Sequence, residues 1–354
     1  MMKSVAIFLL ILFVICAPLD CFSEEFPLQL SVLIVGGGPA GLATAIEAHQ
    51  QGAEVTIVEK RSAYTRIQMV FLIESSLNLL KKWQVSVPNL HVVDFGEGEK
   101  MGFVKINDLE KGLDERVKIL GINKIHGEFS AFSDAGIHVV SAGERRTFDL
   151  PYDIVVAADG VRSNVREELR IQCKKRGFAS GTWAFSIFPD SSGALDISEF
   201  IYRPGYVLRR ISMPHASLIL MQSHVNHPIP VMFNVDTLLW DALDCGWLKE
   251  AAVIATGQAT IVANIEIVFQ QALLFSDRAK RAILVGDTAA TASFFHGMGV
   301  NTALKTAVHA GEFFKEVRYD ADGAFNAFQH HMQTTTDDLI HYCEFLLPPA
   351  TSLP

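Results

Sequence analysis

The amino-acid sequence predicts an α/β fold in which a mostly-β lobe interrupts a lobe built on parallel strands, with helices near the carboxyl end. From Leu30 to Val58 the chain alternates an apolar strand, a helix and a second strand, which is a βαβ unit. Residues 176–275 are rich in Ile, Phe, Val and Tyr and are broken by Pro and Gly, as is typical of sheet. Helical spacing of apolar residues returns at 301–317 and 325–345.

Shorter segments complete the first lobe. Residues 107–120 have the pattern of an amphipathic helix, and strands are expected near 124–132, 136–141 and 154–157. One more buried strand is expected at 282–285. The sheet-rich region therefore separates two parts of one nucleotide-binding lobe.

Composition limits the function classes. A chain of 354 residues, 49% hydrophobic and 19% charged, can bury a large core. The net charge of -9 and the lack of an extended basic run argue against nucleic acid as a partner. No repeat or long linker separates independent domains, so the lobes interleave. We expect a leader at residues 1–23, a first nucleotide-binding part at 30–175, a substrate-binding sheet at 176–275, and a second nucleotide-binding part with the terminal helices at 276–345.

The first 23 residues differ from the rest of the chain. Lys3 precedes an apolar run from Val5 to Ala17, and the acidic pair Glu24-Glu25 follows it. The run is shorter than the roughly 20 residues that span a bilayer, which favours an export signal over a membrane anchor. The charge pattern would leave the globular part translocated. We expect an exported or membrane-associated protein, with a mis-assigned start or a buried helix as the alternative.

The cysteines predict neither a disulfide framework nor a metal site. Two of the five lie in the leader, which leaves Cys173, Cys245 and Cys343 widely separated. No Cys-x-x-Cys or Cys/His metal-ligand spacing is present.

The strongest motif lies between the first strand and the first helix. It is Gly-x-Gly-x-x-Gly at Gly36, Gly38 and Gly41, with Pro39 and Ala40 between the last two. Gly36 permits the tight turn, Gly38 lets a pyrophosphate approach, and Gly41 permits close helix–strand packing. The helix N-terminus offers free N–H groups to phosphates. The glycines alone also fit an ordinary turn, but Glu59 ends the second strand about 20 residues later, where a carboxylate accepts from a ribose. This arrangement predicts a dinucleotide, either NAD or FAD.

Two later segments favour FAD. The segment from Asp153 to Arg166 ends a buried strand in Asp159-Gly160 and then supplies Arg and Ser at a helix start. The segment from Arg281 to Ala290 ends another strand in Gly286-Asp287. A helix opens soon afterwards at Gly297-Met298-Gly299-Val300-Asn301. Each pattern alone is an ordinary strand end, whereas their order and spacing together indicate a flavin site.

The three segments resemble the FAD-dependent monooxygenases, in particular the aromatic hydroxylases related to para-hydroxybenzoate hydroxylase. The resemblance covers residues 31–166 and 281–318, and the intervening sheet only by length and composition. A softer likeness joins the run Glu59-Lys60-Arg61 and residues 106–122 to the flavin domain of the MICAL monooxygenases.

The resemblance implies a role for each motif residue. Gly36, Gly38, Gly41 and Glu59 would hold the ADP half of FAD, and Asp287 the ribityl hydroxyls. Asp159 and Gly160 would face the pyrophosphate and have also been tied to the nicotinamide cofactor. Arg66 would approach the ribitol or pyrophosphate. Lys60 would face the same part of the cofactor, unless it belongs to a solvated loop. The segment Gly297 to Asn301 would meet the isoalloxazine ring, with the helix dipole and Asn301 stabilising reduced flavin.

One departure from the family pattern concerns the ring-facing loop. Phe294 stands where members usually carry proline, and Thr288 to Thr291 stand where a histidine is common. His296 could assist proton transfer or be an ordinary loop histidine. No catalytic residue and no metal ligand is singled out, as expected when a flavin carries the chemistry.

The leading hypothesis is a monooxygenase that takes electrons from NADPH or NADH and hydroxylates an apolar or aromatic small molecule. One alternative is a flavin reductase of the same fold that acts on isoprenoid double bonds. Another is a catalytically altered flavin-binding interaction protein, to which Phe294 lends weight.

Overall fold

The computed structural model describes residues 26, 29–94, 96, 99–141, 147–175, 181–189, 196–198, 200–213, 216–223, 234–267, 269–292 and 297–345. The expected leader at residues 1–23, Phe294 and His296 lie outside this part of the chain. Among the described residues, no helix combines the length and the hydropathy needed to cross a membrane.

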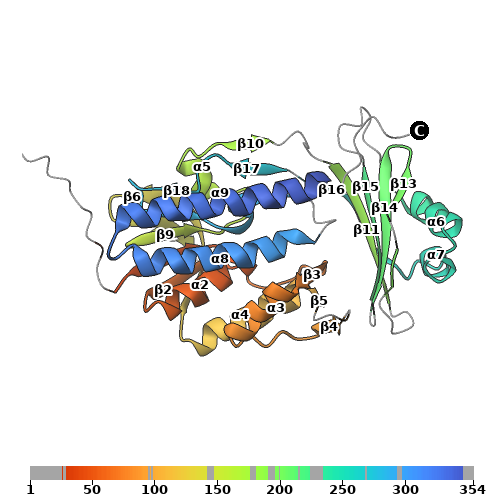
Figure 1. Ribbon diagram of the computed structural model, residues 1–354, viewed down its shortest axis with the longest axis horizontal. Helices are drawn as coiled ribbons and strands as arrows, with labels where there is room; N and C mark the ends of the chain where they lie inside the picture. Colours follow the sequence, from red (N-terminus) through yellow and green to blue (C-terminus); the bar gives the residue numbers. More distant parts are fainter. Residues whose placement is uncertain are drawn as a thin grey trace, which may run out of the picture.

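The first lobe is built on an eight-stranded sheet (Figure 1). Its order is β18 (Ser276–Asp277), β19 (Ala282–Leu284), β9 (Ile154–Ala157), β1 (Ser31–Val35), β2 (Glu54–Glu59), β6 (Asn123–Ser133), β7 (Gly136–Ser141) and β8 (Thr147–Leu150). The strands from β19 to β6 in this order pair in parallel. The chain leaves β1 toward β2 on one side and later returns beside β1 as β9. This change of direction creates the crevice at which open α/β sheets bind ligands.

Helices cover this sheet because their apolar faces match the buried strands. They are α2 (Pro39–Gln50), α4 (Ile106–Ile119), α5 (Asn164–Glu168), α8 (Met298–Glu316) and α9 (Ala321–Phe345). Helix α2 packs against α4 and α8, and α8 against α9. The buried Glu47 carboxylate of α2 accepts hydrogen bonds from Trp83 Nε1 at 2.7 Å and Lys82 Nζ at 2.9 Å. These bonds tie α3 (Glu74–Lys82) to the lobe.

Two small sheets lie beside the large one. One has the order β3 (Met69–Ile73), β5 (Lys100–Lys105) and β4 (His91–Asp94), and the other β10 (Cys173–Lys175), β17 (Gln270–Ala272) and β20 (Ala290–Thr291). Neither α3 nor the first small sheet was expected from the sequence. Cys173 and Cys245 are free thiols.

The second lobe is an antiparallel sheet with two differently covered faces. Its order is β12 (Asp196–Ile197), β14 (Tyr206–Met213), β15 (Ala216–Ser223), β11 (Gly181–Pro189) and β16 (Thr260–Ile267), and β13 (Ile201–Arg203) pairs with β14. Successive residues of a strand point to opposite faces. Leu218 and Leu220 of β15 therefore pack toward the first lobe, while Ile219 and Met221 form a separate core on the outer face.

Two helices, α6 (Val235–Asp244) and α7 (Leu248–Ala255), cover that outer face (Figure 1). The sequence predicts mostly sheet for residues 176–275 and does not reveal these two helices. The Asn234 side chain caps α6 by accepting from the Thr237 N–H at 2.8 Å, and Leu238 and Ala242 then fall on one buried face. Each helix is so short that its periodicity is easily mistaken for an apolar strand.

The expected fold class is confirmed: a parallel-stranded α/β lobe is interleaved with a mostly-β lobe. Helix α4 begins one residue before the expected 107–120, and β6, β7 and β9 lie where strands were expected. Helices α8 and α9 begin at Met298 and Ala321, slightly earlier than expected.

Candidate flavin site

The first turn of the site depends on glycine at two positions. Gly36 has a φ of 109°, and a Cβ there would lie 2.3 Å from the carbonyl oxygen of Ala158 on the neighbouring strand segment. A Cβ on Gly41 would lie 1.9 Å from the Gly36 carbonyl oxygen. Both contacts are impossible for a larger residue, so the fold itself requires these two glycines.

Three other glycines are not required by packing. The nearest atom to a Cβ on Gly38 would be Arg61 Nη2 at 3.8 Å, and a Cβ on Gly160 or Gly299 would meet nothing within 4 Å. All three line the same cavity. Open space in front of glycine backbone suits a ligand that must approach the main chain closely, as a pyrophosphate does.

Glu59 is held in its ionised form at the end of β2. One carboxylate oxygen accepts from the Gly37 N–H at 2.6 Å, and the other accepts from the Arg61 N–H at 2.7 Å. Burial alone would raise the pKa of Glu59, but the Arg61 guanidinium and these N–H groups lower it below its usual value. A charged carboxylate at this strand end can accept hydrogen bonds from a ribose.

Two arginines share one buried acid beside the cavity. Arg61 Nη1 lies 3.2 Å from Oε1 of Glu110, a fully buried residue of α4, and Arg66 pairs with the same oxygen. Both guanidinium groups are partly exposed and line the cavity. Lys60 also lines it, although its Nζ pairs with Glu128 at 2.9 Å. The two guanidinium groups thus border the place where phosphates would lie, and Glu59 and Glu110 balance their charge.

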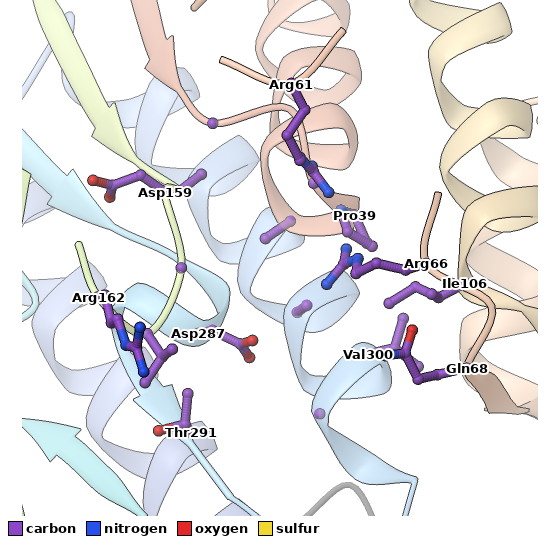
Figure 2. A pocket seen from close by; sticks show the side chains of 18 of the residues that line it. Pro39, Arg61, Arg66, Gln68, Ile106, Asp159, Arg162, Asp287, Thr291 and Val300 are labelled. Carbon is purple, nitrogen blue, oxygen red and sulfur yellow. The ribbon is translucent and has the colours of Figure 1, made fainter. Parts of the chain in front are cut away.

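Thr288 links the two later motifs. Its hydroxyl oxygen accepts from the Gly160 N–H at 3.0 Å, and the Arg166 guanidinium donates to the Thr288 carbonyl at 2.7 Å. Asp159 faces away from the cavity in Figure 2 and accepts from Ser163 Oγ at 2.5 Å and from the Val165 N–H at 3.2 Å. The Asp159 carboxylate thus organises the turn into α5, while the Gly160 backbone faces the cavity.

Asp287 is the acid that points into the cavity. Figure 2 shows its carboxylate and the Arg66 guanidinium extending toward one another from opposite sides. The side chain lines the cavity and is exposed, although protein atoms crowd it closely. This burial raises the pKa of Asp287, and the positive charge of Arg66 opposes the rise.

The N-terminus of α8 brings two glycines and the Val300 side chain to the cavity. Gly297 has a φ of 68°, and a Cβ there would lie 2.2 Å from the ring of Phe71. Gly297, Gly299 and Val300 line the cavity. Their position at the helix start directs the positive end of the helix dipole at it.

Asn301 holds this loop together. Its Oδ1 accepts from the Ile73 N–H at 3.1 Å and from Ser76 Oγ at 2.7 Å, and its Nδ2 donates to the carbonyls of Phe71 at 2.8 Å and Gly297 at 3.0 Å. The amide therefore uses its full hydrogen-bonding capacity within the protein and does not line the cavity.

The cavity has a volume of about 560 Å³ and runs from the first glycine turn to the sheet of the second lobe. This size lies within the range of about 300–1,000 Å³ that is typical of small-molecule sites. Its far end is apolar and is made by Phe71, Leu218, Leu220 and Ala292. One cavity therefore combines a dinucleotide cradle with an apolar compartment.

Most of the predicted site residues line this cavity. They are Gly36, Gly38, Pro39, Ala40, Glu59, Lys60, Arg66, Asp159, Gly160, Asp287, Gly297, Gly299 and Val300. Gly41, Met298 and Asn301 are not part of the lining. Sequence reasoning missed Arg61 as the partner of Glu59, Gln68 and Arg162 as lining residues, and Thr288 as the link between turns. The position of Thr288 directly after Gly286-Asp287 was the available signal.

Comparison with known proteins identifies the cofactor domain. Residues 31–76 match the family model described as FAD binding domain. The match covers β1, the glycine turn, α2 and β2 with Glu59.

Curated relatives resemble parts of the chain. Geranylgeranyl diphosphate reductase of Oryza sativa subsp. japonica is 28% identical over 171 residues, which are 40% of this chain and 36% of that protein. The FAD-dependent monooxygenase OpS4 of Beauveria bassiana is 27% identical over 169 residues, 40% of this chain and 39% of that protein. Human [F-actin]-monooxygenase MICAL2 is 55% identical over 40 residues, 11% of this chain and 2% of that protein. The chain thus matches less than two-fifths of the length of these relatives.

Solved structures show the same fold over nearly the whole chain. The tetrameric form of 2-methyl-3-hydroxypyridine-5-carboxylic acid oxygenase aligns with a TM-score of 0.68 at 18% identity, covering 92% of this chain and 94% of that one. PqsL, a probable FAD-dependent monooxygenase from Pseudomonas aeruginosa, aligns with a TM-score of 0.68 at 15% identity, covering 89% and 95%.

The chain therefore carries an FAD binding domain at its first βαβ unit and is similar in fold to FAD-dependent monooxygenases. The resemblance stated from the three sequence motifs is thereby confirmed, as is FAD as the cofactor of the first lobe.

Proposed function

We propose that the protein is a monooxygenase that takes electrons from NADPH or NADH and inserts one oxygen atom into an apolar or aromatic small molecule. The continuity of the cavity carries this proposal, because the glycine cradle opens directly into the space below Leu218 and Leu220. A flavin held by the cradle would expose its reactive end to an apolar substrate.

The residues present fit FAD. The open space at Gly38, Gly160 and Gly299, the ionised Glu59 and the cavity-facing Asp287 match the donors and acceptors of an ADP half and a ribityl chain. When bound, FAD supplies the redox and oxygen chemistry, and the protein supplies binding and orientation. Glu59 and Asp287 would accept from hydroxyl groups, and Arg66 would partner the pyrophosphate.

The apolar end of the cavity would exclude water and select the substrate by shape. Phe71, Leu218, Leu220 and Ala292 offer no charge to the substrate, so binding there depends on burial of apolar surface. Displacing water also strengthens the electrostatic contacts that the α8 N-terminus makes with the cofactor.

An anaerobic titration tests the proposal. We expect the purified protein to be yellow and its flavin absorbance to bleach on addition of NADPH or NADH without oxygen. Candidate phenols are then added with ¹⁸O₂, and one labelled oxygen should enter the product. Failure of the protein to take up FAD would reject the proposal, and so would product formed without any oxygen consumption.

A second candidate is a reductase of isoprenoid double bonds. Its support is the match to the rice geranylgeranyl diphosphate reductase, which covers 40% of this chain. The same titration with an isoprenoid substrate separates the two activities: a reductase oxidises one NADPH per double bond reduced, consumes no oxygen and adds no label. A flavin-binding interaction protein would turn over neither substrate class.

We also propose that residues 1–23 direct export or membrane association of the protein, on the basis of the apolar run after Lys3. Sequencing the N-terminus of the mature protein tests this. A new N-terminus near Ser23 supports cleavage, whereas an intact Met1 on a soluble protein contradicts both export and anchoring.

A further inference from the structure

The outer surface of the first lobe carries a group of metal-ligating side chains outside the flavin cavity. His309 and Glu312 lie one helical turn apart on α8, and His331 faces them from α9. One ligand atom from each of the three lies within 4.8 Å of the others. The cysteine pattern gave no sign of this site, because its ligands come from two helices and include no cysteine.

The spacing of the ligand atoms suits a metal better than a set of ion pairs. Glu312 Oε2 lies 3.4 Å from His309 Nδ1 and 3.5 Å from His331 Nδ1. A charge-assisted hydrogen bond would be shorter, at about 2.7–2.9 Å. A tetrahedral zinc site with metal–ligand distances of about 2.0–2.1 Å places neighbouring ligand atoms about 3.3–3.4 Å apart.

The hydrogen bond made by the other ring nitrogen of His309 also favours metal binding. Its Nε2 lies 3.0 Å from the hydroxyl oxygen of Thr335, a buried residue of α9. Donation from Nε2–H to this oxygen fixes the ring and leaves the lone pair of Nδ1 directed at Glu312. Histidines that ligate metals are commonly oriented by such a hydrogen bond from the other ring nitrogen.

We propose that His309, Glu312 and His331 bind one Zn²⁺ ion that joins α8 to α9, independently of the flavin. Two imidazoles and one carboxylate are a ligand set that zinc prefers, and a water molecule would complete the tetrahedron. His309 lies ten residues along α8 from Gly299, or about 15 Å at the rise of an α-helix. The ion would therefore connect α8, whose N-terminus lines the flavin cavity, to α9.

Zinc binding to the tag-free, full-length protein tests the proposal. Equilibrium dialysis against Zn²⁺ alone should give one bound ion per chain, and Zn²⁺ should raise the unfolding temperature relative to EDTA because it binds only the assembled helix pair. Ca²⁺, which prefers sets of oxygen ligands, should do neither.

His331→Gln should lower the zinc affinity at least tenfold. Glu312→Gln, at a half-exposed carboxylate, should do the same even if the histidine variant folds poorly. His341→Gln removes an exposed histidine of the same helix outside the cluster and should leave zinc binding unchanged. Absence of bound zinc in the wild type, or equal affinity in the wild type and both cluster variants, would overturn the proposal.

Discussion

At the scale of single residues, the glycines of one motif serve two different needs. Gly41 is required by the fold, because a Cβ would run into the Gly36 carbonyl oxygen at 1.9 Å. Gly38 has room for a methyl group, yet its backbone lines the cavity. The sequence pattern does not separate these roles, whereas the structure assigns one glycine to folding and the other to the ligand.

Gly38→Ala should therefore weaken FAD binding without unfolding the protein. Its extended backbone, with φ of -80° and ψ of -176°, is open to alanine, so the stability of the FAD-free protein should change by less than about 1 kcal/mol. FAD affinity should fall more than about tenfold, because the methyl group occupies the space in front of the backbone. Flavin fluorescence titration measures the affinity. Gly41→Ala is the contrast: it should destabilise the FAD-free protein by about 1–3 kcal/mol.

Substitution of Asp287 is expected to raise the stability of the FAD-free protein and to lower its affinity for FAD. Burial raises its pKa in the folded protein, so the folded state binds the proton more tightly than the unfolded chain does. The resulting stability is present at acidic pH and is lost as the pH rises through the folded pKa. Asp287→Asn removes this loss and should raise the unfolding temperature of the FAD-free protein at pH 7, but not at pH 3.

The same substitution should weaken FAD binding about tenfold, since a hydrogen bond to an ionised acceptor contributes about 1.5–3 kcal/mol and one to a neutral acceptor about 0.5–1.5 kcal/mol. Calorimetry of the FAD-free protein at both pH values, with FAD titration at pH 7, checks the two effects. A variant that binds FAD like the wild type would show that the cavity-facing carboxylate is not a flavin ligand.

At the scale of elements, the side chain of Thr288 connects the turns that follow β9 and β19. Thr288 is fully buried and accepts from the Gly160 N–H. Thr288→Val keeps the shape but leaves that N–H without its acceptor, which should cost about 1–3 kcal/mol. FAD affinity should fall as well, because both turns line the cavity. Thr334→Val, at an exposed hydroxyl of α9, is the matched control and should change neither chemical denaturation nor FAD titration.

The elements also show how far sequence reasoning reaches. Helix α2 and strands β1 and β2 follow from local patterns, because the glycines and Glu59 sit at fixed offsets from them. Helices α6 and α7 do not, since α6 is defined by its Asn234 cap and by burial against a sheet formed elsewhere. Arg61 pairs with Glu110 of α4, and Thr288 accepts from the Gly160 N–H; both of these partners are brought close only by folding.

At the scale of the whole molecule, the cavity is a joint product of both lobes. Leu218 and Leu220 reach it because β15 alternates its side chains between two cores, one against the first lobe and one against α6 and α7. A shift of register by one residue would turn both leucines away from the cavity. The packing of the outer helices thus helps to shape the substrate compartment from the far side of the sheet.

Removal of FAD should accordingly destabilise the whole molecule. A ligand that binds only the folded state at a hundred times its Kd adds about 2.7 kcal/mol, which for a chain of this size corresponds to roughly 4 °C in unfolding temperature. We expect the unfolding temperature to fall by this amount when the flavin is extracted and to recover when FAD is added. Differential scanning calorimetry measures both changes. Gly38→Ala protein, whose Kd should be at least ten times higher, should gain at most about 1.4 kcal/mol, or roughly 2 °C, at the same FAD concentration. An equal gain in both proteins would mean that the stabilising FAD binds somewhere other than the glycine cradle.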